Sequence, residues 1–116
     1  EERLSKAKER DYWYLDLLDK YDEIVFPDMK EEGEVRQWTD ILLKNRKKIV
    51  DEMDKKLIGC RAFWKPLSTQ PTFKTENHCL ENSLKISAQG LWLPSNFSLT
   101  WEQAKLASEV IIKNIN

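Results

Sequence analysis

The first quarter of the chain carries apolar side chains at helical spacing. The stripe runs through Leu4, Ala7, Asp11, Tyr14, Leu18, Tyr21 and Val25, and Asp11 is its one charged member. Steps of three or four residues place them on one side of an α-helix. Pro27 disfavours helical geometry in the residue before it, so the pattern predicts a helix that ends near Phe26.

A second apolar stripe follows at the same period. Its members are Val35, Trp38, Leu42, Ile49, Met53 and Leu57. They predict a helix from Glu34 to Ile58, although the stripe has no apolar member near Asn45 and Arg46. Gly59 stands where a left-handed cap residue is expected. A short link between two long helices favours an antiparallel helical hairpin over residues 1–58.

Residues 59–98 show no sustained period and contain Pro66, Pro71 and Pro94. The segment is too rich in aromatic and aliphatic residues for a free linker, so we expect an extended connector that packs on a surface. Leu84 and Ile86 alternate, and so do Leu91 and Leu93, on the two sides of a turn at Gly90. This pattern also fits a small β-hairpin. Two helical turns within residues 75–84 are a further expectation.

Residues 99–116 predict a C-terminal helix. Thr100 followed by Gln103 has the spacing of a capping box, and the apolar period continues from Trp101 to Asn114. The expected fold class is therefore all-α: a long helical hairpin, an extended connector and a C-terminal helix in one structural unit.

Composition and charge narrow the functional classes. The 116 residues are enough for one domain, 34% are charged, and no apolar run is long enough to span a membrane. The chain begins with Glu1 and has no signal-peptide pattern, so we expect a fragment or a processed chain.

Charge is unevenly spread along the chain. Residues 1–34 hold six basic and twelve acidic groups, whereas residues 44–65 hold eight basic and three acidic groups. The basic members form a candidate basic patch. They are Lys44, Arg46, Lys47, Lys48, Lys55, Lys56, Arg61 and Lys65. Such a patch is either a solvated helix face or a contact for phosphates or an acidic protein.

No catalytic or metal-binding constellation is evident. His78 and Cys79 are adjacent, and with Cys60 they do not match the spacing of zinc ligands or of an oriented nucleophile. The three glycines are isolated, so no phosphate loop exists. No motif of a known family stands out. We therefore expect no catalytic residue, no metal, no cofactor and no small-molecule substrate, that is, a protein that is not an enzyme.

Five tryptophans exceed what one small core needs. The aromatic residues left over are candidates for binding a partner protein. They are Trp13, Phe63, Trp64, Phe73 and Trp92. The favoured function is a non-enzymatic interaction or structural subunit of a larger assembly, such as a scaffold or adaptor. We expect it inside the cell, because two cysteines do not make a disulfide framework.

Two alternatives stay open. The basic patch beside Phe63 and Trp64 also suits an RNA-contacting component of a ribonucleoprotein. The glycosylation sequon at residues 96–98 and a Cys60–Cys79 disulfide would instead fit a small secreted helical factor.

Overall fold

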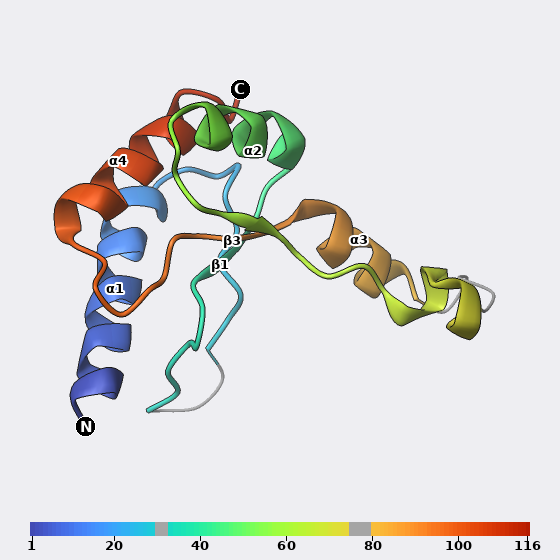
Figure 1. The fold of residues 1–116 in the computed structure, drawn as a ribbon, viewed down its shortest axis with the longest axis horizontal. Coiled ribbons are helices and arrows are strands. Elements are labelled where there is room, and N and C mark those ends of the chain that lie inside the picture. The colour runs from blue at the N-terminus through green and yellow to red at the C-terminus, as the bar shows by residue number, and fades with distance from the viewer. Residues whose placement is uncertain (30–32, 75–79) are drawn as a thin grey trace.

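The computed structural model describes residues 1–29, 33–74 and 80–116 of the chain. Their elements follow in the order α1 (Glu2–Leu18), β1 (Asp40–Leu42), α2 (Arg46–Lys55), β2 (Arg61–Ala62), η1 (Leu67–Thr69), η2 (Pro71–Phe73), α3 (Glu81–Gln89), β3 (Gly90–Trp92) and α4 (Trp101–Ile112). Figure 1 shows α1, α2 and α4 gathered at the sheet, while α3 and the two 3-10 helices project away from it. We call this projection, residues 65–74 and 80–89, the arm.

The three strands form one antiparallel sheet in the order β1-β3-β2. Asp40 pairs with Trp92, and Trp92 pairs with Arg61 on the other side. Directly paired residues point to the same face of a sheet, so these three side chains form one row. Ile41 and Leu91 belong to the next row and point to the opposite face.

The face with Ile41 and Leu91 is covered by helices. Both side chains are fully buried in one apolar cluster to which α1, α2 and α4 contribute. The helical members of this core include Tyr14, Leu18, Ile49, Met53, Ala104, Ala107 and Ile111. The helical core residues therefore pack on the side of the sheet that carries Ile41 and Leu91, opposite to the side that carries Asp40 and Trp92.

The all-α expectation is wrong, because residues 34–58 do not form one helix. Ile41 and Leu43 are buried at a spacing of two residues, which is the period of a strand, and β1 lies there. Only Arg46–Lys55 is helical. The apolar gap at Asn45 and Arg46 was the boundary between the two elements, since Asn45 is the N-cap of α2.

The predicted helical hairpin is wrong for a second reason. α1 ends at Leu18, eight residues before Phe26, and packs along α4 rather than α2. Val25, which we assigned to the helical stripe, pairs with Leu42 through two backbone hydrogen bonds of 3.0 and 2.8 Å. Sheet pairing with a distant segment thus overrides the local helical period.

The connector is more regular than expected. It contains β2, α3 and β3, and α3 includes both residues that we assigned to the first strand of a small hairpin, Leu84 and Ile86. Gly90 is the first residue of β3 and not a turn. No residue of α3 is buried, so the arm has little packing of its own.

The C-terminal helix is confirmed. The side-chain oxygen of Thr100 accepts from the backbone N–H of Gln103 at 3.3 Å, and the Gln103 side chain accepts from the backbone N–H of Thr100 at 3.1 Å. This capping box satisfies two amides at the start of α4 through residues close in sequence, which is why the sequence alone could locate it.

Candidate functional site

The side of the sheet with Asp40 and Trp92 carries an aromatic cluster, formed by Trp38, Phe63, Trp64 and Trp92. The rings of Trp38 and Trp92 are stacked, with centroids 4.9 Å apart. Trp64 stands edge-on to Trp92 at 4.6 Å, and Phe63 stands edge-on to it at 5.9 Å. Trp92 is 8% exposed, but Trp38 and Trp64 remain 37% and 59% exposed. We call this side of the sheet the open sheet face.

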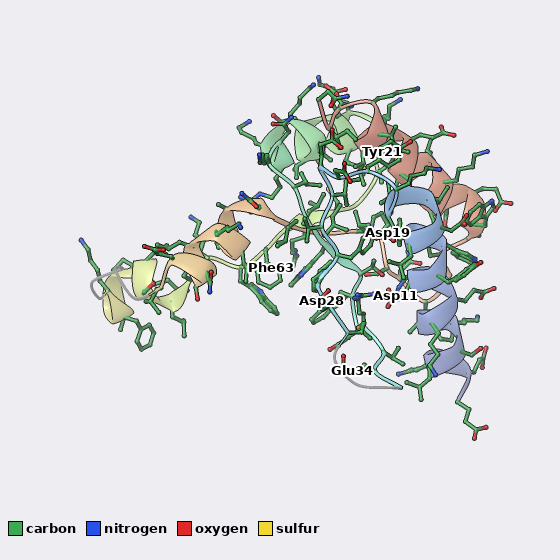
Figure 2. The ribbon with its side chains drawn as sticks, turned by 180° about the vertical axis from the view of Figure 1, so that it is seen from behind. Asp11, Asp19, Tyr21, Asp28, Glu34 and Phe63 are labelled. Carbon is green, nitrogen blue, oxygen red and sulfur yellow. The ribbon has the colours of Figure 1, made fainter. Side chains whose placement is uncertain are left out.

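Strand geometry brings the cluster together. Trp92 points outward from the middle strand, and Trp38 lies two residues before Asp40, on the same face. Phe63 follows β2, and its backbone N–H donates to the carbonyl of Gly90 at 3.0 Å. Figure 2 shows Phe63 where the arm leaves the sheet.

Asp40 is a half-buried ionisable side chain on this face. Burial raises the pKa of its carboxyl group to about 6, Arg36 partly opposes the shift, and Asp11 adds to it. Its Oδ1 is buried without a hydrogen-bond partner among the described residues, and so is Nε1 of the paired Trp92. These two atoms, on directly paired residues, are thus both buried and unsatisfied. Buried polar atoms in a protein interior are normally hydrogen-bonded.

A buried polar network holds the segment before β1 against α1. Arg10 is 7% exposed and donates to Oγ1 of Thr39 at 3.3 Å. The Thr39 hydroxyl donates to Asp11, whose carboxylate also lies 3.7 Å from Arg36. Figure 2 shows Asp11 between α1 and the strands. Because every charged group in this network is ion-paired or hydrogen-bonded, we assign it to positioning Trp38 and Asp40 and not to chemistry.

Two cavities lie beside the sheet and α2, and the larger of the two shares Trp38 and Trp92 with the open sheet face. The larger, of about 620 Å³, opens at the C-terminal end of β3, between the α2–β2 loop and α4. The smaller, of about 540 Å³, lies against α2 and is lined by lysines and two acidic residues.

The structure distributes the predicted aromatic candidates over three places. Phe63, Trp64 and Trp92 meet in the cluster. Trp13 is half-buried and packs edge-on against Trp101 at 6.1 Å. Phe73 is 58% exposed on the arm. The sequence interpretation missed Trp38, which it assigned to a helix core, and Asp40, whose alternation with Ile41 and Leu43 was the available signal.

The predicted basic patch is divided. Around α2, the lysine side chains at 44, 47, 48 and 55 line the smaller cavity, where Lys47 and Lys55 pair with neighbouring carboxylates at 2.8 and 2.6 Å. Arg46 is structural, because its guanidinium donates to the backbone carbonyls of Ser87 and Gly90. Lys56 and Arg61 line the larger cavity instead, and Lys65 is exposed at the start of the arm.

Residues 1–111 match the sequence model of the DegT/DnrJ/EryC1/StrS aminotransferase family. The chain belongs to this family. Among curated protein sequences, none matches it.

Solved structures show the same fold. DesV of S. venezuelae, in complex with a ketimine intermediate, matches with TM-score 0.86 and 16% identity over 94% of this chain and 31% of its own. A DegT DnrJ EryC1 StrS aminotransferase from Brucella abortus matches with TM-score 0.82 and 19% identity over 96% and 31%. The E. coli GDP-4-keto-6-deoxy-D-mannose-3-dehydratase with bound hydrated PLP matches with TM-score 0.76 and 17% identity over 94% and 31%. The chain thus spans about a third of the length of these structures.

Family membership overturns the functional expectation from the sequence. A family of aminotransferases is not a class of scaffolds or adaptors, so the expectation of a non-enzymatic structural subunit is wrong. The same family membership contradicts the two alternative functions, an RNA-contacting component and a secreted factor. It also contradicts the expectation that no small-molecule substrate is involved. His78 lies outside the described residues, and so does Cys79, the cysteine that the secreted-factor alternative would pair with Cys60. No helix in the described ranges is long and apolar enough to cross a membrane.

The described residues do not fit a pyridoxal phosphate site. Such a site needs a lysine amine for the Schiff base, a partner for the pyridine nitrogen and donors for the phosphate. Every lysine in residues 1–29, 33–74 and 80–116 is exposed. The buried Asp11 is already engaged by Thr39 and Arg36. Without a buried lysine, the described residues do not complete such a site by themselves.

We expect Asp40→Asn to stabilise the chain at neutral pH and to leave its stability unchanged at pH 3. The folded-state pKa of about 6 lies above the unfolded value of roughly 3.9. The folded state therefore binds the extra proton between these values, and the contribution of Asp40 to stability falls as pH rises from about 4 to 6. Urea unfolding at several pH values measures the difference.

The exposed Asp16 on α1 provides the control, because Asp16→Asn removes one negative charge without touching the sheet. If Asp40→Asn gave no pH-dependent gain over Asp16→Asn, the assignment of the raised pKa would be wrong.

Proposed function

We propose that this chain forms the part of a sugar aminotransferase that does not hold the cofactor. The observation that carries the proposal is the fit of 94% of the chain onto only 31% of DesV, combined with the exposure of every described lysine. A cofactor-bearing part of about twice the length, in the same polypeptide or in another, would complete the enzyme. The reaction class is transfer of an amino group to a keto sugar, and pyridoxal phosphate supplies that chemistry when bound elsewhere.

The open sheet face is the surface that we assign to the cofactor-bearing part. An antiparallel sheet with one solvated face normally carries polar residues there. This face instead presents Trp38, Phe63, Trp64 and Trp92 together with two unsatisfied buried polar atoms. Covering it would remove apolar surface from water and could satisfy Asp40 and Trp92.

The substrate class is inferred from the names of solved structures that share this fold. One structural neighbour is named for a GDP-linked keto sugar, and another was solved with a ketimine intermediate. A nucleotide-linked keto sugar is therefore the acceptor that we propose for the assembled enzyme. An intracellular location is part of this proposal, since the two-cysteine composition suits a reducing compartment and Cys60 is a free thiol.

The test uses the complete natural enzyme, purified and saturated with pyridoxal phosphate. Amino transfer from an L-amino acid to nucleotide-linked keto sugars is followed by mass spectrometry of the sugar product. We expect Trp64→Ala to lower kcat/KM by about tenfold, which is the loss of roughly 1.4 kcal/mol from a large contact. The matched control is Phe97→Ala, an exposed aromatic outside the open sheet face.

Two results would count against the proposal. One is a fully loaded enzyme that transfers no amino group to any nucleotide-linked keto sugar. The other is stoichiometric trapping of pyridoxal phosphate, by borohydride reduction, on a single lysine of the 116-residue chain alone.

A further inference from the structure

The larger cavity exists because β2 is short. β2 pairs with β3 only through Arg61 and Ala62, so the residues before it, Ile58 to Cys60, are not paired with the continuation of β3 from Leu93 to Asn96. The space between these two segments is closed on a third side by α4. Its volume of about 620 Å³ is within the roughly 300–1,000 Å³ that small-molecule sites occupy. We call it the strand-end cavity.

The charge of the strand-end cavity has one sign. Lys56 and Arg61 line it, and no acidic residue does among the described residues that line it. Burial, with a smaller effect from Asp54, raises the pKa of the third ionisable lining residue, Cys60, to about 11, so its thiol is neutral at pH 7. The cavity therefore attracts anions.

The lining also offers apolar surface. Trp38 and Trp92 both line the cavity, and their rings are stacked on each other. A flat apolar ring is the shape that packs best on aromatic side chains.

Leu57 supplies an independent observation. It has φ 56, and the backbone N–H groups of Leu57 and Ile58 donate to the carbonyls of Asp54 and Met53, so it occupies the C′ position of a Schellman motif. Glycine is favoured there because a Cβ is strained at positive φ, and our expectation that Gly59 would take this position is wrong. The side chain is nevertheless leucine and 94% exposed, at the rim of the cavity.

The leucine therefore carries two costs, strain and exposure, with no packing gain in the chain itself. On the opposite rim, Leu106 of α4 is 47% exposed. Two uncovered leucines from different elements thus flank one cationic cavity. Backbone strain that is retained without local benefit is typical of binding sites.

We propose that the strand-end cavity binds an aromatic anion, with its ring against Trp92 and the flanking leucines and its anionic group held by Lys56 and Arg61. The bound anion is a carboxylate or a phosphate on the ring. This inference does not rest on the proposed aminotransferase activity, because neither the cofactor nor the keto sugar takes part in it.

Binding is measured by isothermal titration of the 116-residue protein at low salt. The probes are 2-naphthoate and 2-naphthyl phosphate, and the controls are 2-naphthol, acetate and inorganic phosphate. We expect at least one probe to bind with Kd on the order of 1 mM or tighter, given about 0.3 kcal/mol per ligand atom, and to bind better than any control. The tighter of the two probes identifies the anionic group. Equal binding of 2-naphthol, or no binding of either probe, would overturn the proposal.

Leu57→Gly separates a binding role from a structural one. Relief of strain should raise Tm by about 3–5 °C for a domain of this size, whereas loss of the apolar rim should weaken probe binding by about fivefold. Lys56→Gln with Arg61→Gln should weaken it by about tenfold, and Lys44→Gln with Lys47→Gln at the smaller cavity should leave it unchanged. Unaltered affinity in Leu57→Gly, with the expected gain in Tm, would refute the role of Leu57.

Discussion

Replacing Arg10 with alanine is expected to lower the free energy of unfolding by about 3 kcal/mol, because several acceptors lose hydrogen bonds from one charged donor. The guanidinium of Arg10 donates to Thr39, to the carbonyl of Ser95 at 2.7 Å, and to the carbonyls of Arg36 and Gln37, both at 3.1 Å. Three of these acceptors belong to the segment before β1, and the fourth belongs to the segment after β3. Without Arg10, they lose a shared donor in a place that water reaches poorly.

Urea unfolding followed by far-UV circular dichroism measures this effect. Arg3→Ala is the matched control, because Arg3 is exposed on the same helix and should change the unfolding free energy by less than about 0.5 kcal/mol. A cost below about 1 kcal/mol for Arg10→Ala would mean that the network is not what fixes the segment before β1.

Replacing Gly90 with alanine is expected to destabilise the chain by about 2–3 kcal/mol through overpacking. A Cβ at this position would lie 2.7 Å from the carbonyl oxygen of Ile86 and 2.7 Å from Cβ of Phe63. The first contact is backbone, so it cannot be relieved by a rotamer change. The second would push Phe63 away from the sheet and disturb its edge-on contact with Trp92.

Near-UV circular dichroism reports the packing of the aromatic cluster, and urea unfolding reports the global stability. Both are measured on the Gly90→Ala variant. Gly59→Ala is the control, because a Cβ there has no atom within 4 Å. Should Gly90→Ala keep the near-UV spectrum and the stability of the parent chain, the close approach of Phe63 to β3 would be wrong.

Local signals were sufficient for two elements. The capping box of Thr100 and Gln103 and the apolar period of α4 lie within one stretch of sequence, and the structure confirms both. The core of α1 was also readable, since Tyr14 and Leu18 stand at helical spacing and are fully buried. In these segments the hydrogen bonds that form the element join residues three or four apart.

Around β1 the same helical period was ambiguous between a helix and a strand. Trp38 and Leu42 are four residues apart and fit a helix, but Ile41 and Leu43 are the buried pair of a strand whose partners are β3 and Val25. Short apolar runs cannot be divided between helix and strand by periodicity alone. β1 is fixed by a pairing with residues about fifty positions later, which no window of local sequence contains.

The residues of the candidate site also divide into those that the sequence predicted and those that only the structure identified. Phe63, Trp64 and Trp92 were predicted from the excess of large aromatics, without knowledge of where they would meet. Trp38 and Asp40 were missed because their role depends on standing beside Trp92 across the sheet. The enzyme family was missed for a different reason: no motif of a known family stood out in the sequence, and the family model that matches residues 1–111 decided it.

By itself, the sequence determined the elements whose stabilising contacts are local: the helix after Thr100, the helix that carries Tyr14 and Leu18, and the presence of aromatic side chains beyond the needs of a core. The tertiary structure alone decided the three-stranded sheet, the stacking of Trp38 on Trp92, the raised pKa of Asp40 and the cationic cavity beside Leu57. Each of these arises from contacts between segments distant in sequence, where burial and strand pairing, and not local propensity, set the free energy.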